Sequence, residues 1–309
     1  MKTLYLITDD QVVSKNGNNI AISHDNTVLT NEQIFNISDI VIMGNTQITS
    51  QALKFLITNG VNITHADKSG NIYAFTNAMN EKRCDIRLIQ YSALLDENFK
   101  IGIARIFCRK KIQTQIDYLY SKRKNNTIKD CKEIEKLLLQ LSECNNINDI
   151  MGVEGYAARI YFKSLSCISM LDIRTRRPAK DIYNSLLNLT YSLLLHKVNV
   201  VVFSKGLDIS LGFLHSQKSG RPSLSLDFLE LFRTEADKFV TTITNRKEFT
   251  QKDFVIDRET GGYCLTNDAF KKYIKKYSQS ILIDENIEKM INLFILTIKT
   301  KDVNIFDEA

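Results

Sequence analysis

The sequence predicts an α+β fold, in which a small amino-terminal β-sheet domain over residues 1–80 precedes a larger all-α domain over residues 81–309. Three observations favour this division. The amino-terminal part contains short β-branched runs separated by Asn, Asp and Gly, as in strands joined by turns. Beyond it, turn signals become sparse and apolar residues recur at helical spacing. The length of 309 residues and the 44% hydrophobic content suit about two domains with a sizeable core.

The amino-terminal strands are expected in five runs, LYLI, QVVS, NIAIS, TVLT and FNISDIVIM, with one helix at residues 50–60 and a hairpin around residues 68–71. Short strands such as residues 35–43, FNISDIVIM, need partners. An exposed hydrophobic edge is a liability unless another chain covers it. We therefore expect a symmetric homodimer formed largely by residues 1–80.

The second domain is expected to consist of helices, because its apolar residues follow a 3.6-residue period. We place the boundary between the domains at residues 77–83. The expected helical segments are residues 85–96, 99–120, 132–143, 153–166, 179–196, 224–239 and 269–277.

The helical stretch at residues 223–233, SLSLDFLELFR, is apolar around most of its circumference and carries two acids, Asp227 and Glu230, in a narrow polar slot. Residues three apart on a helix have Cβ atoms about 5–6 Å apart, close enough to share a cation. Buried acids are costly unless they are paired or bound to a metal. Alternatively, the two acids belong to a solvated stripe on an amphipathic helix.

Two further residues extend this candidate site. His215 ends the glycine-punctuated stretch GLDISLGFLH, and Glu154 opens a candidate helix, MGVEGYAARIYF, whose alanines would let another helix approach closely. Glu154, His215 and Glu230, with Asp227 alongside, form a mixed nitrogen and oxygen ligand set. Such a set suits Mg²⁺ or Mn²⁺ better than structural zinc.

Three sequence blocks carry a family resemblance. They are G-x-E-G-x-A-A-R-x-Y-F at residues 152–162, G-L-D-x-x-x-G-F-L-H at residues 206–215, and S-L-x-x-D-x-x-E-x-F-R at residues 223–233. They resemble the signature blocks of CRISPR-associated protein one, and the pattern at residues 43–70, MGNTQITSQALKFLITNGVNITHADKSG, matches that family as well. The resemblance covers nearly the whole chain, in the right order.

The resemblance implies a metal-dependent DNA endonuclease and integrase that inserts foreign DNA fragments as new spacers into a CRISPR array. It implies that Glu154, His215 and Glu230 bind Mg²⁺ or Mn²⁺, and that Asp227 assists directly or through another ligand. A DNA 3′-hydroxyl, or water in the nuclease reaction, would attack a phosphodiester in line. The implied partners are double-stranded DNA, a second copy of the chain, and the small CRISPR-associated protein two, which bridges pairs of dimers.

The net charge of +6 favours a polyanionic partner without demanding one. We expect phosphate contacts from the basic residues closest in sequence to the candidate site. They are Arg174, Arg176, Arg177, Lys218 and Arg221. For Arg109, Lys110 and Lys111, which follow one another on one helix, the plainer interpretation is a solvated helix face.

Several other classes of protein are excluded or disfavoured. The chain has no G-K dipeptide for a Walker loop and no G-x-G for a dinucleotide fingerprint. Six scattered cysteines without a C-x-x-C pair argue against a zinc ribbon or a disulfide framework. The start lacks a signal-peptide pattern, and no apolar run approaches the ~18 residues of a membrane span, so we expect a cytoplasmic protein without membrane contact.

Two rival hypotheses stay open. One is a non-catalytic, basic DNA-binding scaffold in which the acids are structural, and the other is a transposon-borne integrase of the same fold. A metal-dependent strand-transfer assay separates the enzyme from the scaffold. For the enzyme we also expect that changing Glu154, His215 or Glu230 to alanine leaves folding intact or slightly improved but abolishes metal-dependent nicking and strand transfer. The premise is that the acids repel one another when no cation is present.

Overall fold

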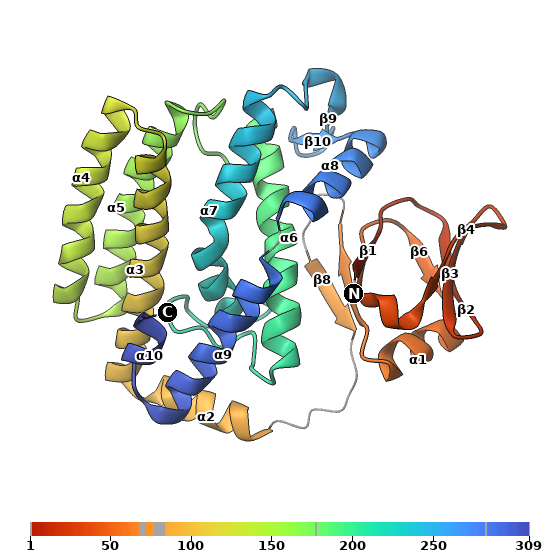
Figure 1. The fold of residues 1–309 in the computed structure, drawn as a ribbon, viewed down its shortest axis with the longest axis horizontal. Helices are drawn as coiled ribbons and strands as arrows, with labels where there is room; N and C mark the ends of the chain where they lie inside the picture. The colour runs from red at the N-terminus through yellow and green to blue at the C-terminus, as the bar shows by residue number, and fades with distance from the viewer. Residues whose placement is uncertain (1, 68–71, 77–83, 177, 282, 309) are drawn as a thin grey trace. The chain divides into compact units, whose positions relative to one another are not determined.

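The computed structural model describes residues 2–67, 72–76, 84–176, 178–281 and 283–308, and it confirms the predicted α+β class (Figure 1). A β-sheet region comes first and a mostly helical part follows. The chain divides into two compact units. The β unit contains Met1–Glu81, Asp253–Val255 and Cys264–Tyr277. The helical unit contains Lys82–Lys252, Ile256–Tyr263 and Ser278–Ala309.

This division differs from a simple cut between residues 80 and 81. Two short segments from late in the chain belong to the β unit, although we placed them in the helical domain. A linear reading could not assign them, because domain membership depends on long-range packing. The expected boundary segment, residues 77–83, and the expected hairpin at residues 68–71 lie outside the described residues.

The first sheet of the β unit has the strand order β1-β5-β7-β8. Its strands are Lys2–Leu6, Ile37–Ile42, Asn62–Ala66 and Ile72–Thr76. β5 pairs in parallel with β1 on one side and with β7 on the other, so it is an interior strand. Our expectation that the run FNISDIVIM forms an exposed edge was therefore wrong. Ile40, Val41 and Ile42 form an unbroken apolar run and are all buried, as is typical of a strand covered on both faces.

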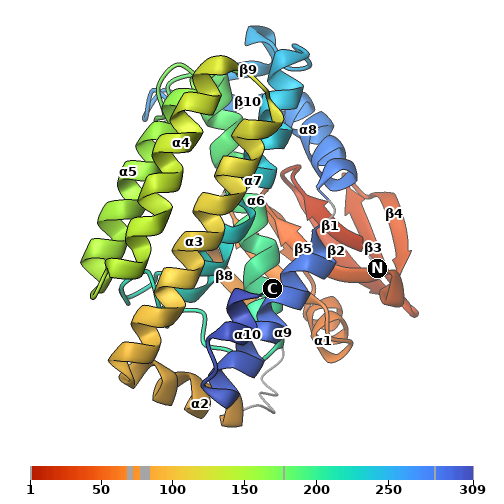
Figure 2. The same cartoon turned by 60° about the vertical axis from the view of Figure 1, so that its left-hand side comes forward.

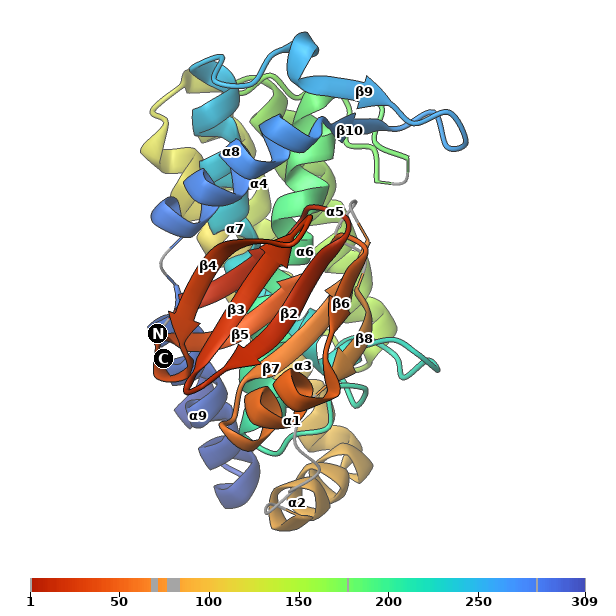
Figure 3. The same cartoon turned by 90° about the vertical axis from the view of Figure 1, so that its right-hand side faces the viewer.

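The second sheet has the order β4-β3-β2-β6, visible side by side in Figure 3. Its strands are Thr27–Gln33, Asn19–His24, Gln11–Asn16 and Thr46–Ile48. Asp25 and Asn26 join β3 to β4 with φ of 49° and 60°, the two positive values that a two-residue type I′ hairpin needs. β4 lies at the edge of this sheet, and its Val28 and Leu29 are 61% and 58% exposed.

The core of the β unit is aliphatic, with Val13, Ile20, Ile40, Leu56 and Ile63 at its centre. Leu56 comes from helix α1 (Ser50–Thr58), which Thr49 caps by accepting a hydrogen bond from the backbone N–H of Ala52. These side chains hold the strands of both sheets and α1 in one core.

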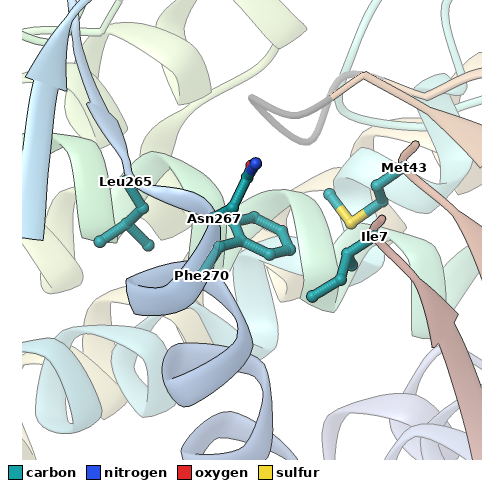
Figure 4. A pocket seen from close by; sticks show the side chains of 5 residues that line it. All are labelled: Ile7, Met43, Leu265, Asn267 and Phe270. Atoms are coloured by element: carbon teal, nitrogen blue, oxygen red, sulfur yellow. The ribbon is translucent and has the colours of Figure 1, made fainter. Parts of the chain in front are cut away.

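Helix α8 (Asn267–Ser280) lies almost entirely in the β unit. A cavity of about 20 Å³, room for roughly one water molecule, is lined by Ile7 and Met43 together with Leu265, Asn267 and Phe270 (Figure 4). Its lining brings α8 against the residues that follow strands β1 and β5. The cavity contains no candidate site residue.

The remaining elements belong mainly to the helical unit. They are α2 (Cys84–Leu95), α3 (Glu97–Ser121), α4 (Asn125–Gln140), α5 (Ile147–Ser166), α6 (Ile182–Ser204), α7 (Ser223–Asn245), α9 (Asp284–Thr300) and α10 (Asn304–Asp307). Strands β9 (Phe254–Ile256) and β10 (Tyr263–Leu265) each have two of their three residues in the β unit. Short 3₁₀ turns lie at Ile34–Asn36 in the β unit, and at Leu141–Glu143 and Gln251–Asp253. Figure 2 shows α3, α4 and α5 side by side, and each packs on the other two.

Helix α7 is the central element of this unit, because it packs against both α3 and α6. Four phenylalanine rings fix its first half against three other helices. Phe228 of α7 lies 5.2 Å from Phe107 of α3 and 5.3 Å from Phe294 of α9, and Phe306 of α10 lies 5.0 Å from Phe107. Edge-on aromatic pairs of this kind add about 0.5–1.5 kcal/mol each beyond the area they bury.

Helix α6 continues to Ser204, beyond the end we expected at residue 196. By length and composition alone it could cross a membrane, which the sequence reading overlooked. However, 61% of the relevant window is buried inside the structure, and α6 packs on α7 and α9. It is the core helix of this unit, and its burial explains why the β-branched run VNVVV remains helical.

Candidate metal centre

Asp227 anchors the loop that carries His215. The side chain comes from the second turn of α7 and is fully buried. Its Oδ2 accepts hydrogen bonds from the backbone N–H groups of Phe213 (2.6 Å) and Leu214 (3.0 Å), and its Oδ1 accepts one from the N–H of His215 (2.9 Å). A Cβ on Gly212 would lie 2.9 Å from Asp227 Oδ2, so only glycine fits this turn.

The same carboxylate orients the His215 ring. Nδ1 of His215 lies 2.7 Å from Asp227 Oδ1. Because an ionised carboxylate can only accept, Nδ1 carries the proton and Nε2 keeps its lone pair. This is the arrangement in which a carboxylate holds a metal-binding histidine in the correct tautomer. Asp227 has no oxygen left without a partner, and its position therefore suits orientation better than direct coordination.

Glu154 and Glu230 meet at the side chain of Lys111. Glu154 belongs to α5, Glu230 to α7 and Lys111 to α3. Lys111 Nζ donates to Glu154 Oε1 and lies 2.5 Å from Glu230 Oε2. The side chains of Lys111 and Glu230 are 8% and 5% exposed, and that of Glu154 is 23% exposed. Two acids from different helices thus share one cation.

A second cation flanks Glu230. Arg233 Nε lies 2.8 Å from Glu230 Oε2, one helical turn further along α7. Burial would raise the pKa of Glu230, but the Arg233 guanidinium and the Lys111 ammonium lower it to about 2. His215 is a further and smaller cause of this lowering, so its ring lies within electrostatic range of the Glu230 carboxylate. Glu230 is therefore ionised at neutral pH.

Glu230 Oε2 forms ion pairs with Lys111 and Arg233, but neither contact has the geometry of a hydrogen bond. This oxygen is buried and has no aligned hydrogen-bond donor among the described residues. It is an acceptor that a cation, rather than a directional donor, satisfies. Carboxylate oxygens from Glu154 and Glu230 with the free Nε2 of His215 match the donors expected of a site for a hard divalent cation.

No three His, Cys, Asp or Glu side chains converge as a metal-binding group in the described part of the chain. The Lys111 ammonium fills the space between the two glutamates instead. The residue types fit Mg²⁺ or Mn²⁺, and the ammonium stands in for a cation in the place where these carboxylates meet.

Sequence reasoning missed Lys111 and gave Arg233 no role. The plainer interpretation of residues 109–111, a solvated helix face, does not hold for Lys111, which is buried. Its neighbours differ, because Arg109 pairs with the Asp307 carboxylate and Lys110 Nζ donates 3.0 Å to the Asp307 carbonyl. Lys111 lies on the buried stripe of α3 with Cys108 and Gln115, a spacing that could have shown that it faces inward.

Helix α5 begins at Ile147, where Asn146 caps it, so Glu154 lies in the second turn rather than at the helix start that we expected. Gly152 and Gly155 remain exposed within the helix. Ala157 is fully buried, and α5 packs on α3, as the small residues beside the acid predicted. This packing brings Glu154 to Lys111.

Arg174 is part of the structure around the site. Its guanidinium donates to Asn184 Oδ1 (2.8 Å) and Asn188 Oδ1 (2.7 Å), and it lies 5.8 Å from the centre of the Tyr191 ring. Burial lowers the pKa of Arg174, although not enough to neutralise a guanidinium. Arg174 therefore has a packing role whether or not it also contacts phosphate.

The other four basic candidates differ from Arg174. Arg176 and Lys218 are exposed and Arg221 is half-buried, and the described residues give none of the three an ion pair. Arg177 lies outside the described residues. Lys218 and Arg221 lie in the segment between His215 and the start of α7, which brings their backbone close to the candidate site.

A hollow of about 380 Å³ in the helical unit does not coincide with this site. Its lining includes Met170, Asp181, Tyr183, Lys247 and Phe249, and none of the candidate residues.

Comparison with known proteins identifies the family. The family profile described as "CRISPR associated protein Cas1" matches residues 4–279. The chain belongs to the Cas1 family. This agrees with the resemblance of the three sequence blocks.

Two curated Cas1 relatives cover most of the chain. "CRISPR-associated endonuclease Cas1 3" of Thermus thermophilus is 30% identical over 281 residues, which are 89% of this chain and 83% of the relative. "CRISPR-associated endonuclease Cas1 1" of Chlorobaculum tepidum is 30% identical over 295 residues, covering 90% and 86%.

Solved structures share the Cas1 fold. A Cas1 protein from Thermotoga maritima has a TM-score of 0.86 at 20% identity, covering 96% of this chain and 97% of that one. A casposase bound to integration product has a TM-score of 0.84 at 22% identity, covering 98% and 92%. At these identities the likeness concerns the fold.

Proposed function

We propose that this Cas1 family member is a divalent-metal-dependent DNA endonuclease and integrase that inserts DNA fragments as new spacers into a CRISPR array. One observation carries the proposal. Carboxylates from two helices meet at a single cation position beside a histidine whose tautomer a third acid fixes. A DNA-binding scaffold would have no need for this arrangement. The curated relatives are named endonucleases, which supports a reaction at a phosphodiester.

Each residue of the candidate metal centre would have a distinct role. Glu154, Glu230 and Nε2 of His215 would hold Mg²⁺ or Mn²⁺, which when bound supplies Lewis-acid polarisation of a phosphodiester. Asp227 orients His215 through Nδ1 and fixes the loop that carries it. Arg233 keeps Glu230 ionised. A DNA 3′-hydroxyl, or water in the nuclease reaction, forms the new P–O bond while the opposite P–O bond breaks.

The DNA would be held by exposed cations beside the site. Arg176, Lys218 and Arg221 are the described residues best placed for phosphate contacts, because no internal partner neutralises them. Solved relatives include a Cas1–DNA complex with a TM-score of 0.54 to this chain, and a complex that contains Cas1 and Cas2. We therefore propose double-stranded DNA and the small CRISPR-associated protein two as partners, acting in the cytoplasm.

The β unit would supply the homodimer contact. Strand β4 is the edge of its sheet, and its Val28 and Leu29, followed by Phe35 at 62% exposure, form an apolar border. An edge of this kind is normally covered. The proposed dimer therefore uses β4 rather than the interior strand β5.

A strand-transfer assay tests the enzyme hypothesis. Wild-type protein should join a labelled DNA 3′ end to a repeat-containing duplex with Mn²⁺ or Mg²⁺, and should not do so in EDTA. His215→Ala and Glu230→Gln should lower the rate by at least about 1,000-fold, the loss of several kcal/mol of transition-state stabilisation. Glu235→Gln is the matched control, since Glu235 lies on the same helix and pairs with Lys238 at the surface.

The opposite result would favour the scaffold. If both site variants transfer strands at the wild-type rate per folded molecule, the assignment of this centre is wrong. Strand transfer that occurs only into a transposon end, and not into a repeat array, would favour the transposon-borne integrase.

A further inference from the structure

We propose that the Lys111 ammonium is a displaceable internal counter-cation, which closes the Glu154–Glu230 pair in the metal-free protein and must leave when a divalent cation binds. This inference rests on the proposed metal site. It adds a residue outside the ligand set and gives it a defined role in metal binding. Lys111 is on this view a positioning residue, because it acts through the two glutamates.

The burial of Lys111 indicates that its charge is paired. The residue is 6% exposed, and lysine is almost never buried unless it is paired. Its partners are the two carboxylates, which approach it from α5 and α7. Two carboxylate oxygens at contact distance are the partners that a buried ammonium requires.

The local charge is already balanced without a metal. Two glutamates face one ammonium and one guanidinium, Lys111 and Arg233, so two negative charges meet two positive ones. Even when the Asp227 carboxylate behind His215 is counted as a third negative charge, a divalent cation added to this set would leave an excess of positive charge in a buried cluster. Opposed charges at contact distance in a protein interior interact by several kcal/mol even at an effective dielectric constant of about 20. Like charges repel to the same extent, so the ion cannot simply be added.

Lys111 is the cation better suited to leave. Its Nζ lies where both carboxylates converge, which is the place a shared metal ion would occupy, whereas Arg233 contacts only Glu230. A lysine side chain has four flexible methylene groups and can withdraw its charge by changing rotamers. The Arg233 guanidinium is instead held 4.5 Å from the centre of the Tyr191 ring.

Competition of this kind lowers the apparent affinity for the metal. When only a fraction of molecules have the site open, the apparent Kd rises by the inverse of that fraction. If the ammonium occupies the site in nine molecules of ten, removing it should tighten metal binding about tenfold. The metal-free protein should at the same time become less stable, because two buried carboxylates lose their shared partner.

The test measures Mn²⁺ binding by calorimetry, and Tm in EDTA and in Mn²⁺, for the full-length chain. Lys111→Met keeps the length of the side chain and removes its charge. We expect this variant to melt below wild type in EDTA, to bind Mn²⁺ at least about tenfold more tightly, and to gain more Tm from Mn²⁺. Lys110→Met is the matched control and should bind Mn²⁺ like wild type, because Lys110 contacts Asp307 and not the glutamates.

Lys111→Gln is the second variant, for the case that Lys111→Met does not fold in EDTA. A variant that folds only when Mn²⁺ is added supports the proposal, since the ion then replaces the ammonium. If both variants stay unfolded in Mn²⁺, or if a folded variant binds Mn²⁺ no more tightly than wild type, the displacement proposal is overturned.

A Glu154→Gln, Glu230→Gln double variant separates this failure from a failure of the proposed function. If wild type and Lys111→Met bind Mn²⁺ no better than the double variant, the metal site itself is wrong and the displacement proposal falls with it. If wild type binds Mn²⁺ well and Lys111→Met does not bind it more tightly, only the role of Lys111 is wrong.

Discussion

Helix α7 carries two acidic centres that differ in the kind of partner they have. At Glu230 the partners are charged, an ammonium and a guanidinium, and the contacts to its buried Oε2 lack hydrogen-bond alignment. At Asp237, further along the helix, the partners are two hydroxyls, with Tyr161 donating at 2.6 Å and Tyr191 at 2.5 Å. Both acids are buried.

This difference separates an acid whose partner a metal ion can replace, Glu230, from an acid whose partners cannot be replaced, Asp237. Burial raises the pKa of Asp237 and the two hydroxyls only partly oppose it, whereas the neighbouring cations lower that of Glu230. Directional hydroxyl donors held by packed rings cannot be replaced by an ion. A flexible ammonium can. Burial alone therefore does not reveal a functional acid, whereas the mobility and charge of its partner do.

Asp227 lies near the start of α7, beside the candidate metal centre, and its partners are also held in place. It accepts three backbone hydrogen bonds and one from His215, so Asp227→Ala should lower the free energy of unfolding by about 3 kcal/mol or more. Strand transfer per folded molecule should fall about 10–100-fold, as when a group behind a metal ligand is lost. Urea denaturation and the strand-transfer assay measure the two effects. Unchanged stability would contradict the anchoring role.

The structure changes our expectation for the other acids. We reasoned that alanine at Glu154 or Glu230 would leave folding intact because the carboxylates repel one another without a metal. That premise was wrong, since Lys111 and Arg233 compensate them. Removing Glu230 would leave two buried cations short of a partner, so we expect a loss of stability.

Tyr191→Phe tests the fixed centre without touching the exchangeable one. The change removes one hydroxyl that donates to Asp237 and keeps the ring beneath Arg233. We expect the free energy of unfolding to fall by about 2 kcal/mol, typical of a hydrogen bond to a charged group. The rise in Tm on adding Mn²⁺ should not change.

Tyr73→Phe is the control for this variant, because Tyr73 is 70% exposed. A Tyr191→Phe protein that responds to Mn²⁺ differently from wild type would show that the two acidic centres are coupled, and the comparison between them would fail.

His196 provides a third case, a buried titratable group to which the described residues give no ionic partner. It lies in α6, and burial, reinforced by Lys197, lowers its pKa to about 3. The unfolded chain binds a proton near pH 6.5, but the folded protein does not, so stability present above that pH is lost as the pH falls toward 3. This group should contribute a slope of up to about 1.4 kcal/mol per pH unit in that window.

His196→Leu should flatten the stability profile between pH 6.5 and 3, as measured by urea denaturation at a series of pH values. His24→Leu, the same substitution at a partly exposed position on strand β3, is the matched control. Equal slopes for wild type and His196→Leu would mean that His196 is solvated.

Arg174 and Arg176 show the same contrast, because Arg174 donates to internal partners whereas Arg176 is exposed. We expect their substitution to have the smallest effects. Arg176→Ala should lower the slope of log Kd for duplex DNA against log salt by about 1, the loss of one phosphate contact, and should leave Tm unchanged. Arg174→Ala should lower Tm, because Asn188 Oδ1 loses its donor and Asn184 Oδ1 keeps only the Thr175 N–H. An unchanged salt slope for Arg176→Ala would show that this residue does not contact DNA.

The sequence by itself determined the fold class, the family and the positions of Asp227 and Glu230 within one turn of a helix. Periods of two and 3.6 residues are local properties, and residues three apart on a helix must be neighbours. The same local pattern identified the loop that carries His215. It did not predict α9, and α4 begins at Asn125, ahead of the start expected at residue 132.

Only the tertiary structure decided which partner each acid has. Lys111 and Glu154 lie 43 positions apart and meet because α3 packs on α5. Asp227 and Glu230 look equivalent in the sequence, but one faces backbone amides of a returning loop and the other faces cations from two helices. The charge of a partner depends on packing between distant segments, and no spacing along a single chain encodes it.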